Sequence, residues 1–392
     1  MKTKIMILTA LLTGGAIRAD VRFVMPFYER YVAIDGVCAW PQLNQLQNGE
    51  IAALIWPETN HGLTEGAAEC WNSRDGGISW QRVGVPVPHE PGMNRMNLAS
   101  GLTHDGALIT VVSGWDRVRA KVPPGQPLPP APPGPLRGKT RNPVPAVSRD
   151  GGRTWVQFSE VPPMPGSNGD ALIPHGRIIP LQNGKLGAMF YGYAVYFVTS
   201  ADGGKTWQKR GQLNEGKNDE MDRSHNETNW LPLANGDLFA AARTYGDRIL
   251  EAFRSTDGGV TWKSEGPLTM PSQHPASLVT LPDGKILLSY GLRNSGNRGI
   301  AIRLADSTAR LWSDPFTLVD FGDLPVAPGV KRPTDGGYPS TIVTPDGMLI
   351  TAYYTASIPT HPRYHMGVVR WKLDPAVVRW PQDEGKFRKK KS

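Results

Sequence analysis

The sequence predicts an all-β chain built from repeated β-hairpins, and two repeats support this prediction. The first repeat is a turn motif, Ser-X-Asp-Gly-Gly-X-Thr/Ser-Trp, which occurs four times, at 73–80, 148–155, 200–207 and 255–262. Asp-Gly-Gly favours a tight turn, because glycine accepts positive φ and the aspartate side chain bonds within its own turn. The flanking residues suit strands. Each copy is therefore expected to be a hairpin tip with its Trp packed beneath the turn.

The second repeat is an Asn-Gly or Asp-Gly turn that leads into an apolar strand, and it occurs six times. The turns lie at 48–49, 105–106, 183–184, 235–236, 283–284 and 346–347, and the expected strands at 51–56, 107–113, 185–191, 237–243, 285–290 and 348–354. A Trp-ending turn follows each of the first four hairpins, and segment 305–312 keeps Asp306 and Trp312 without the glycines. Two hairpins per unit predict a six-bladed β-propeller with four-stranded antiparallel blades. Segment 366–371 is expected to pair the last blade with the N-terminal region.

Three regions are expected along the 392 residues. Residues 1–19 have a basic start, a short apolar run and small residues at Ala16 and Ala19, which predicts a secretory signal peptide. The apolar run is too short for stable membrane insertion, although an uncleaved anchor is the alternative. Residues 20–380 form the propeller, and 381–392 form a basic, disordered tail. The protein is therefore expected to be secreted or periplasmic.

The charge distribution argues against nucleic-acid binding. The signal peptide carries three basic residues and residues 386–391 carry five, so the formal charge of +8 leaves the rest of the chain without net charge. The tail is either a solvated end or a weak contact for anionic surfaces.

Two local features leave alternatives open. Residues 122–145 begin with a proline-rich run that cannot be a central strand, so they are expected to form a surface insertion within the second blade. The run could also be a ligand for a proline-reading partner. Cys38 and Cys70 could form a disulfide or remain as two buried thiols. The spacing of His and Cys suggests no zinc site, and no cofactor is expected.

The repeated Asp-Gly-Gly-X-Thr-Trp turns resemble the Asp-box repeats of the sialidase (neuraminidase) superfamily, over nearly the whole mature chain. Segment 226–243 is similar to the sialidase segment that starts with the catalytic Glu, here Glu227, and ends with a carboxylate-binding Arg, here Arg243. Arg298 lies seven residues before the fifth box position, where the family has another carboxylate-binding Arg. Tyr338 follows two glycines in the segment that presents the family's nucleophilic Tyr.

This resemblance implies a specific chemistry. Two guanidinium groups can hold a substrate carboxylate in a bidentate manner. A neutral phenol can attack an anomeric carbon that bears a carboxylate, where an anionic nucleophile would be repelled, provided a nearby Glu takes its proton. Tyr338 would be the nucleophile, Glu227 the base, and Arg243 and Arg298 the substrate-binding residues. Each also has a structural alternative: a satisfied carboxylate, a packing aromatic, or arginines that bridge blades.

The chain departs from the family pattern at linked positions. Ala39 stands where blade one usually presents a third Arg, and Tyr354 stands near where the family has a Glu that steadies that Arg. The usual acid/base Asp is not evident. Its loop offers Glu65 or His61 instead, so we expect Glu65 as a catalytic residue and His61 as a substrate-binding one, with ordinary loop residues as the alternative for both. Five further residues are expected at or near inner strand ends without assigned roles: His175, Arg177, Tyr193, His274 and Arg293.

The sequence therefore predicts an exported exo-glycosidase of sialidase type that removes a terminal acidic sugar, such as a sialic acid, from glycoconjugates with retention of configuration. No metal is expected at the site. One alternative is a related propeller glycosidase that acts on another saccharide, and a second is a non-catalytic carbohydrate-binding propeller. A glycan is the expected partner, and the sequence leaves the oligomeric state open.

Overall fold

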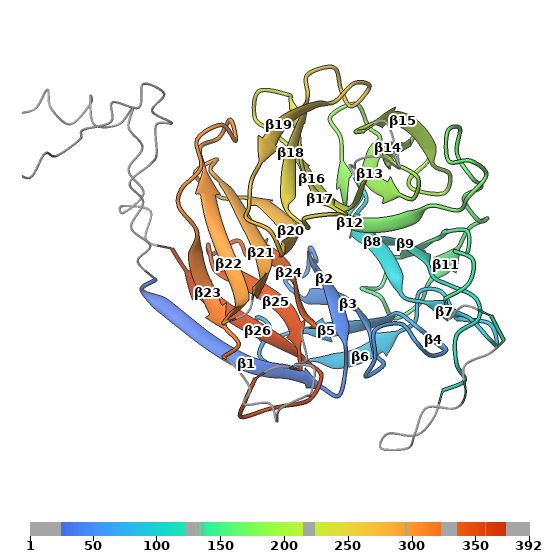
Figure 1. Ribbon diagram of the computed structural model, residues 1–392, viewed down its shortest axis with the longest axis horizontal. Coiled ribbons are helices and arrows are strands. Elements are labelled where there is room, and N and C mark those ends of the chain that lie inside the picture. Colours follow the sequence, from blue (N-terminus) through green and yellow to red (C-terminus); the bar gives the residue numbers. More distant parts are fainter. Residues whose placement is uncertain are drawn as a thin grey trace, which may run out of the picture.

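The computed structural model describes residues 25–121, 130, 133–134, 137–214, 224–294, 296–322, 335–356 and 358–373, and all its regular elements are strands (Figure 1). The predicted signal peptide 1–19 and tail 381–392 lie outside the described residues, as does most of the proline-rich part of the insertion. Among the described residues, no helix is long and apolar enough to span a bilayer.

The strands form four sheets of four strands, one sheet of eight and one parallel pair. The first four-stranded sheet contains β2 (Ala39–Gln45), β3 (Ile51–Trp56), β5 (Glu69–Ser73) and β6 (Gln81–Gly84). The second contains β16 (His225–Pro232), β17 (Leu238–Thr244), β18 (Leu250–Ser255) and β19 (Lys263–Pro267). The third contains β20 (Gln273–Thr280), β21 (Ile286–Asn294), β22 (Asn297–Ala305) and β23 (Phe316–Asp320). The fourth contains β24 (Gly336–Val343), β25 (Leu349–Thr355), β26 (His365–Lys372) and β1 (Phe27–Asp35).

The eight-stranded sheet joins two antiparallel units through one parallel pair. One unit contains β8 (Asn97–Leu102), β9 (Leu108–Ser113), β10 (Val144–Ser148) and β11 (Val156–Gln157). The other contains β12 (Ile173–Pro180), β13 (Leu186–Tyr191), β14 (Val195–Ser200) and β15 (Gln208–Gln212). Strands β8 and β12 pair in parallel. A Cβ at Gly101 would lie 1.8 Å from the Ile178 carbonyl oxygen, so glycine permits this approach. A short parallel pair, β4 (Gly66–Ala67) and β7 (Asn94–Arg95), completes the strands.

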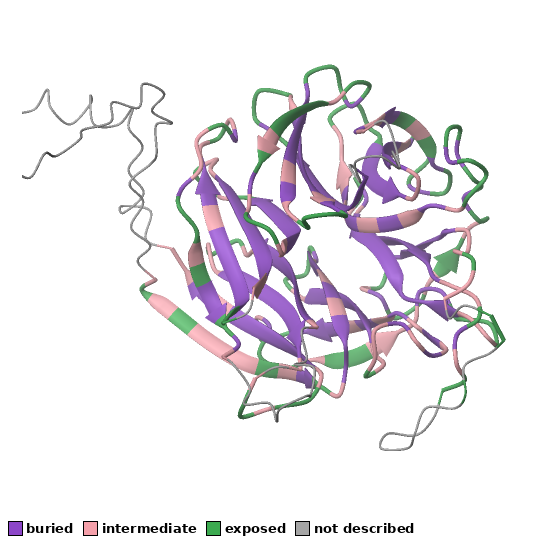
Figure 2. Cartoon of the chain, in the orientation of Figure 1, coloured by how far each residue is buried: buried purple, intermediate pink, exposed green. Residues whose placement is uncertain are grey.

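The sheets are arranged around the middle of the molecule, as Figure 1 shows. The inner strands contact one another in the order β2, β8, β12, β16, β20, β24 and back to β2. The expected pairing of segment 366–371 with the N-terminal region is confirmed, because β26 pairs with β1 in an antiparallel manner. Most inner and middle strands are mostly buried, while β11 and β19 are largely exposed and β6 and β15 are partly exposed (Figure 2).

All six predicted Asn-Gly or Asp-Gly turns connect an inner strand to the next strand. Their glycines have φ between 77° and 90°, the left-handed region that the motif predicts. The strands that follow start within one residue of the predicted positions. Strand β3 matches its prediction in full, and β21 extends four residues further than expected.

The Asp-box turns share one hydrogen-bond pattern. In the last glycine-containing copy, Asp257 accepts bonds from the Ser255 hydroxyl at 2.8 Å, the Thr261 amide at 3.0 Å and the Thr261 hydroxyl at 2.6 Å. The Trp262 indole donates to the Gly259 carbonyl at 3.2 Å. The fifth turn keeps this bond with Ala309, which takes φ 53° where the other copies have glycine. Of the five Trp side chains, Trp207 is buried and the other four are half-buried against the core.

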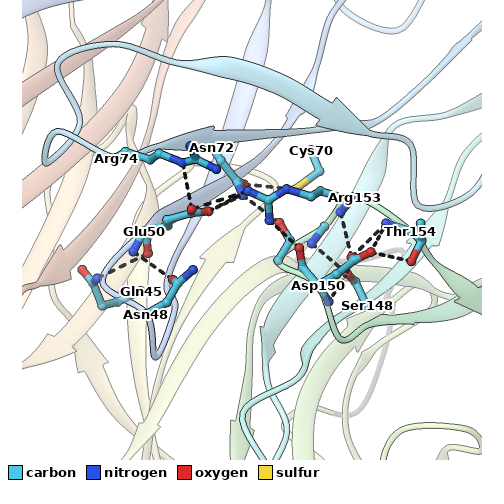
Figure 3. Close-up of polar contacts among 12 residues, drawn as sticks. Gln45, Asn48, Glu50, Cys70, Asn72, Arg74, Ser148, Asp150, Arg153 and Thr154 are labelled. Atoms are coloured by element: carbon cyan, nitrogen blue, oxygen red, sulfur yellow. Dashed lines mark hydrogen bonds and ion pairs between the residues drawn. The ribbon is translucent and has the colours of Figure 1, made fainter.

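A polar network joins the first hairpin turn to the second Asp box (Figure 3). The Glu50 carboxylate accepts bonds from Arg74 at 2.9 Å, Asn72 at 3.1 Å and Arg153 at 3.2 Å. Asn72 also donates to the Gly151 carbonyl at 2.8 Å. Residues of two neighbouring sheets are thereby connected at the periphery. Nearby, Cys70 is buried and free, and burial raises the pKa of its thiol to about 12. Cys38 is also a free buried thiol, so the two cysteines form no disulfide.

Candidate functional site

Five of the six inner strands contain a register shift near their start. A β-bulge inserts an unpaired residue and re-aims its side chain. The shifts lie between Ala39 and Gln42, His175 and Ile179, His225 and Thr228, Gln273 and Ala276, and Gly337 and Ser340. The side chains within or beside these shifts include Trp40, His175, Glu227, His274 and Tyr338.

Glu227 and Tyr338, 111 residues apart, form a direct hydrogen-bonded pair. The Tyr338 hydroxyl donates to Oε1 of Glu227. Arg243, on β17, donates from Nη1 to Oε2 of Glu227 at 2.5 Å, and the same nitrogen lies 3.5 Å from the Tyr338 hydroxyl. Glu227 is 7% exposed and Tyr338 is 6% exposed. The predicted nucleophile, base and one predicted arginine therefore lie together.

The electrostatics of this cluster favour a carboxylate beside a neutral phenol. Burial by itself raises the pKa of Glu227, but the Arg243 charge, together with His175 and the Tyr338 hydrogen bond, holds it well below its usual range. Burial and the Glu227 anion raise the pKa of Tyr338 well above its usual value, with partial opposition from Arg243 and Arg293. At neutral pH the pair is thus Glu227 carboxylate and Tyr338 phenol, the state in which a carboxylate can accept a phenolic proton.

Tyr338 is held in an uncommon backbone conformation and surrounded by rings. Its φ of 49° lies in the left-handed region, which costs a non-glycine residue about 1–3 kcal/mol and persists only where the surroundings enforce it. Trp40 stacks on its ring with centroids 5.1 Å apart and 11° between planes. The Arg293 guanidinium lies 5.2 Å from its ring centroid, and His175 contacts it edge-on at 6.3 Å. A small pocket reaches Tyr338 and Glu227, bordered by Trp40, His175 and Tyr191.

Several buried nitrogens around this pair have no hydrogen-bond partner among the described residues. They are Nε of Arg243, Nε and Nη2 of Arg293, and both ring nitrogens of His274. Burial lowers the pKa of His274 to about 2, with Arg293 and Arg243 adding to the effect, so this ring is neutral. An unsatisfied buried donor costs about 1–3 kcal/mol. The cluster can therefore gain stability from an acidic or polar ligand that supplies acceptors.

Arg298 and Glu65 are two further predicted residues. Arg298, on β22, is 8% exposed and pairs across the hairpin with Arg293, which is the residue that contacts the Tyr338 ring. The Glu65 carboxylate accepts a hydrogen bond from the Gly92 amide. The substrate-binding role of Arg298 and the catalytic role of Glu65 remain predictions.

His61 lies beside the cluster and is held by Asp335. Its Nδ1 lies 3.0 Å from Oδ2 of Asp335, and its ring packs edge-on against Trp40 with centroids 4.4 Å apart. Asp335 also accepts hydrogen bonds from Tyr354 at 2.5 Å and Tyr364 at 2.6 Å. Burial works against the Asp335 charge, but these bonds, with His61 contributing most, hold the pKa of the carboxyl far below its usual value.

The two positions that depart from the sialidase pattern contribute to this wall. Ala39 is fully buried with φ 50°, and the next residue, Trp40, points its ring at Tyr338. Tyr354 binds Asp335 and lies 5.7 Å from the Tyr338 ring. Aromatic rings and an Asp–His pair therefore occupy the place where the family pattern has an arginine and its glutamate.

Sequence reasoning gave no role to Trp40, Asp335 or Arg293. One signal was present for Asp335, because Asp335-Gly-Gly is an Asp-box start that lacks the Thr/Ser and Trp. Here the two glycines lead directly to Tyr338 instead of closing a hairpin. Trp40 carried no such signal, since its orientation depends on the bulge in β2.

Comparison with known families identifies the chain. The model of the BNR repeat-like domain family matches residues 134–350, more than half of the chain. The chain belongs to this family. Sialidases are among the solved structures that share its fold. The curated proteins include no significant match to its sequence.

Three solved structures illustrate the shared fold. A protein of unknown function from Dyadobacter fermentans has 22% identity and a TM-score of 0.71, covering 91% of this chain and 100% of its own. The intramolecular trans-sialidase from Ruminococcus gnavus, in complex with oseltamivir carboxylate, has 14% identity and a TM-score of 0.66, covering 89% and 98%. The NanB sialidase from Streptococcus pneumoniae has 13% identity and a TM-score of 0.62, covering 94% and 70%. At these identities the likeness establishes the fold alone.

Proposed function

We propose that this protein is a retaining exo-glycosidase of the sialidase superfamily that releases a terminal acidic sugar, with sialic acid as the first candidate. The observation that supports the proposal most strongly is the buried contact between the Tyr338 hydroxyl and the Glu227 carboxylate, with Arg243 beside both. The fold would be a six-bladed propeller whose four-stranded blades each contribute one strand to the inner ring. The predicted signal peptide would export the enzyme to the periplasm or the medium.

In this proposal the Tyr338 oxygen attacks the anomeric carbon while its proton moves to Glu227, and the glycosidic bond breaks with its electron pair on the leaving oxygen. The ionised Glu227 accepts the proton over the existing hydrogen bond, and the Arg243 charge stabilises the carboxylate before transfer. The glycosyl–tyrosine bond is then hydrolysed by water, which restores the phenol and gives net retention. Tyr338 is well placed for this role, because Trp40 and Arg293 fix its ring.

The unsatisfied nitrogens of Arg243 and Arg293 support an acidic sugar. Both are buried and have cationic charge without a full set of acceptors among the described residues. A carboxylate can bind guanidinium groups in a bidentate manner. The Ruminococcus gnavus neighbour is itself complexed with a carboxylate ligand, oseltamivir carboxylate. Arg293 is a candidate for the substrate contact that the sequence pattern assigned to Arg298.

A second candidate is a related glycosidase that acts on a different saccharide. The specific observation in its favour is that Ala39 and Tyr354 stand where the family pattern has an arginine and a glutamate, and that the rings of Trp40 and Tyr354 lie beside Tyr338. Rings suit packing against the apolar face of a sugar more than binding a carboxylate. The Glu227–Tyr338 pair would be retained, and the specificity would change.

The test is release of the fluorophore from an aryl α-sialoside by the wild type, Tyr338→Phe and Tyr196→Phe. Turnover should fall by about 10³-fold or more in Tyr338→Phe, because the nucleophile is lost. Tyr196, whose hydroxyl donates to the Gly166 carbonyl, is the matched control and should keep activity. Turnover of other aryl glycosides alone would favour the second candidate. Sugar binding without any turnover would favour a non-catalytic carbohydrate-binding protein.

A further inference from the structure

A retaining glycosidase needs a proton donor for the leaving group, and the residues nearest to Tyr338 are poorly suited to that role. Glu227 is ionised and serves as the proposed base for Tyr338. His274 is neutral, and burial also lowers the pKa of His175, so both rings favour the neutral form, which is a poor general acid. A general acid must be protonated and able to reach the substrate.

The loop after β3 carries two carboxylates that are already engaged. Glu58 forms an ion pair with Lys121 at 2.7 Å. Glu65 accepts the Gly92 amide hydrogen bond and thereby joins two loop segments. Both carboxylates therefore have structural contacts that a role in proton transfer would break.

His61, on the same loop, has the geometry that those carboxylates lack. Its Nδ1 faces Asp335, which is ionised, so Nδ1 carries the hydrogen and the ring orientation is fixed. No hydrogen bond of the described residues uses its Nε2, and 31% of the side chain is exposed. The Trp40 ring contacts both His61 and Tyr338, which places the imidazole at the border of the cluster.

We propose that His61 is the acid/base catalyst of this site and that Asp335 is the residue that positions it; the inference rests on the proposed function. In the first step the protonated Nε2 gives its proton to the glycosidic oxygen as the bond to the anomeric carbon breaks. The electron pair stays on the leaving oxygen, and the Tyr338 oxygen bonds to the carbon. In the second step neutral His61 takes a proton from water, whose oxygen displaces Tyr338. The phenolate then recovers its proton from Glu227.

The groups around the His61–Asp335 pair fit this role. Tyr354 and Tyr364 donate to the same carboxylate, and the Cys38 thiol completes the near surroundings of His61. Arg293 and Arg137 interact with the Asp335 charge. The buried anion therefore has enough partners to remain ionised while it stabilises an imidazolium.

A bound metal ion is the alternative explanation for the cluster of Cys38, His61 and Asp335. Ligand atoms of Cys38, His61 and Asp335 lie within 4.8 Å of one another, and zinc binds such atoms. However, burial raises the pKa of the Cys38 thiol well above its usual value, which disfavours the thiolate that zinc requires. The Asp335 oxygens also already accept three donors.

The test compares His61→Ala with the wild type on sialosides of graded leaving groups, from difluoromethylumbelliferone to lactose. Loss of a general acid should reduce kcat/KM by about 10²–10⁴-fold for lactose and have little effect on the aryl group, which leaves without a proton. Azide should accelerate the second step of His61→Ala with the aryl substrate. His104→Ala, an exposed histidine on a distant turn, is the matched control.

Asp335→Asn provides a readout that a merely structural role would not give. Its loss of kcat/KM should grow from the aryl sialoside to the lactose sialoside, as in His61→Ala, because the imidazole is no longer held in the orientation that proton transfer needs. A uniform loss over all leaving groups in His61→Ala would overturn the inference while leaving the proposed function in place. Stoichiometric zinc binding that Cys38→Ser abolishes, with activity dependent on zinc, would also overturn it. Absence of turnover in the wild type would sink both proposals.

Discussion

The Asp-box turns at the periphery and the bulged strand starts at the centre are specified in different ways. The four glycine-containing box turns repeat one sequence and one hydrogen-bond pattern, with an aspartate that binds its own turn. The central bulges repeat a backbone irregularity, but each presents a different side chain, such as Trp40, Glu227 or Tyr338. The periphery is thus specified by local sequence, whereas the site is specified by where the strands meet.

This difference separates stability from chemistry. A box turn satisfies its polar groups within about eight residues, so a change there should affect folding and leave the site intact. The central groups have unsatisfied nitrogens and a left-handed Tyr338, both of which are unfavourable for folding. Such features are expected at functional sites. Substitutions at the periphery should therefore change stability and leave activity per folded molecule unchanged, whereas substitutions at the centre should change activity.

The largest effect is expected at the centre, for Glu227→Gln. The amide cannot take the Tyr338 proton, so kcat on the aryl sialoside should fall by about 10²–10⁴-fold. The melting temperature should fall as well, because Arg243 loses a buried anionic partner. Glu50→Gln, in the peripheral network of Figure 3, is the control and should keep kcat. Equal activity of Glu227→Gln and the wild type would remove Glu227 from the mechanism.

The next effect is expected for Arg293→Met. Loss of a charged hydrogen-bond donor should lower kcat/KM on an acidic sugar by about 10–100-fold. The melting temperature should stay constant or rise, since a buried guanidinium with unsatisfied nitrogens is removed. Arg298→Met is the comparison, because the sequence pattern assigns the same role to Arg298. A larger loss in Arg298→Met, measured on the same acidic substrate, would reverse the assignment.

At the periphery, Asp257→Ala should destabilise the protein by about 1–3 kcal/mol. Its carboxylate accepts hydrogen bonds from Ser255 and Thr261 that hold the turn together. Denaturant unfolding measures the loss, with Thr256→Ala, at the exposed adjacent position, as control. Activity per folded molecule should not change. A fall in kcat at full folding would show that this turn is coupled to the centre.

Acid should destabilise the box turns over a defined pH window. Although burial raises the pKa of Asp75 and Asp150, their hydrogen bonds to Ser79 and Thr154 lower it to about 2 in the folded state, from an ordinary value near 3.8. A carboxyl with a lowered pKa stabilises the fold above its unfolded pKa, so stability should be lost as pH falls from about 4 through 2. Melting temperature against pH measures this. The slope over this window should be shallower in Asp75→Asn.

The smallest effect is expected for Ala309→Gly in the fifth turn. Ala309 has φ 53° where the other four turns have glycine, which strains an alanine. Glycine removes that strain but adds flexibility to the unfolded chain, so the free energy of unfolding should rise by at most about 1 kcal/mol. Ala305→Gly, in a regular strand, should instead destabilise. A lower stability of Ala309→Gly would mean that packing of the Ala309 methyl group stabilises the fold by more than the positive φ destabilises it.

The turns and the strands beside them could be predicted because their signals are local. Asn235-Gly236 and its equivalents need only positive φ at glycine to form a hairpin. The pairing of Glu227 with Tyr338 was also predictable, from the resemblance of two separate segments to one family pattern. The sequence could not show which of Arg298 and Arg293 contacts the site, because the two residues pair with each other across one hairpin.

Local sequence specifies the hairpins, the box turns and the repeats that place the chain in the BNR repeat-like domain family. These depend on residues within about ten positions of one another, where φ preferences and side-chain hydrogen bonds act. The stacking of Trp40 on Tyr338 and the hydrogen bond between His61 and Asp335 depend instead on the tertiary structure. Those contacts join β2, the loop after β3 and the start of β24, and their geometry is set by bulges in strands that meet at the centre. No local pattern encodes such a meeting, because it depends on how every sheet packs against the next.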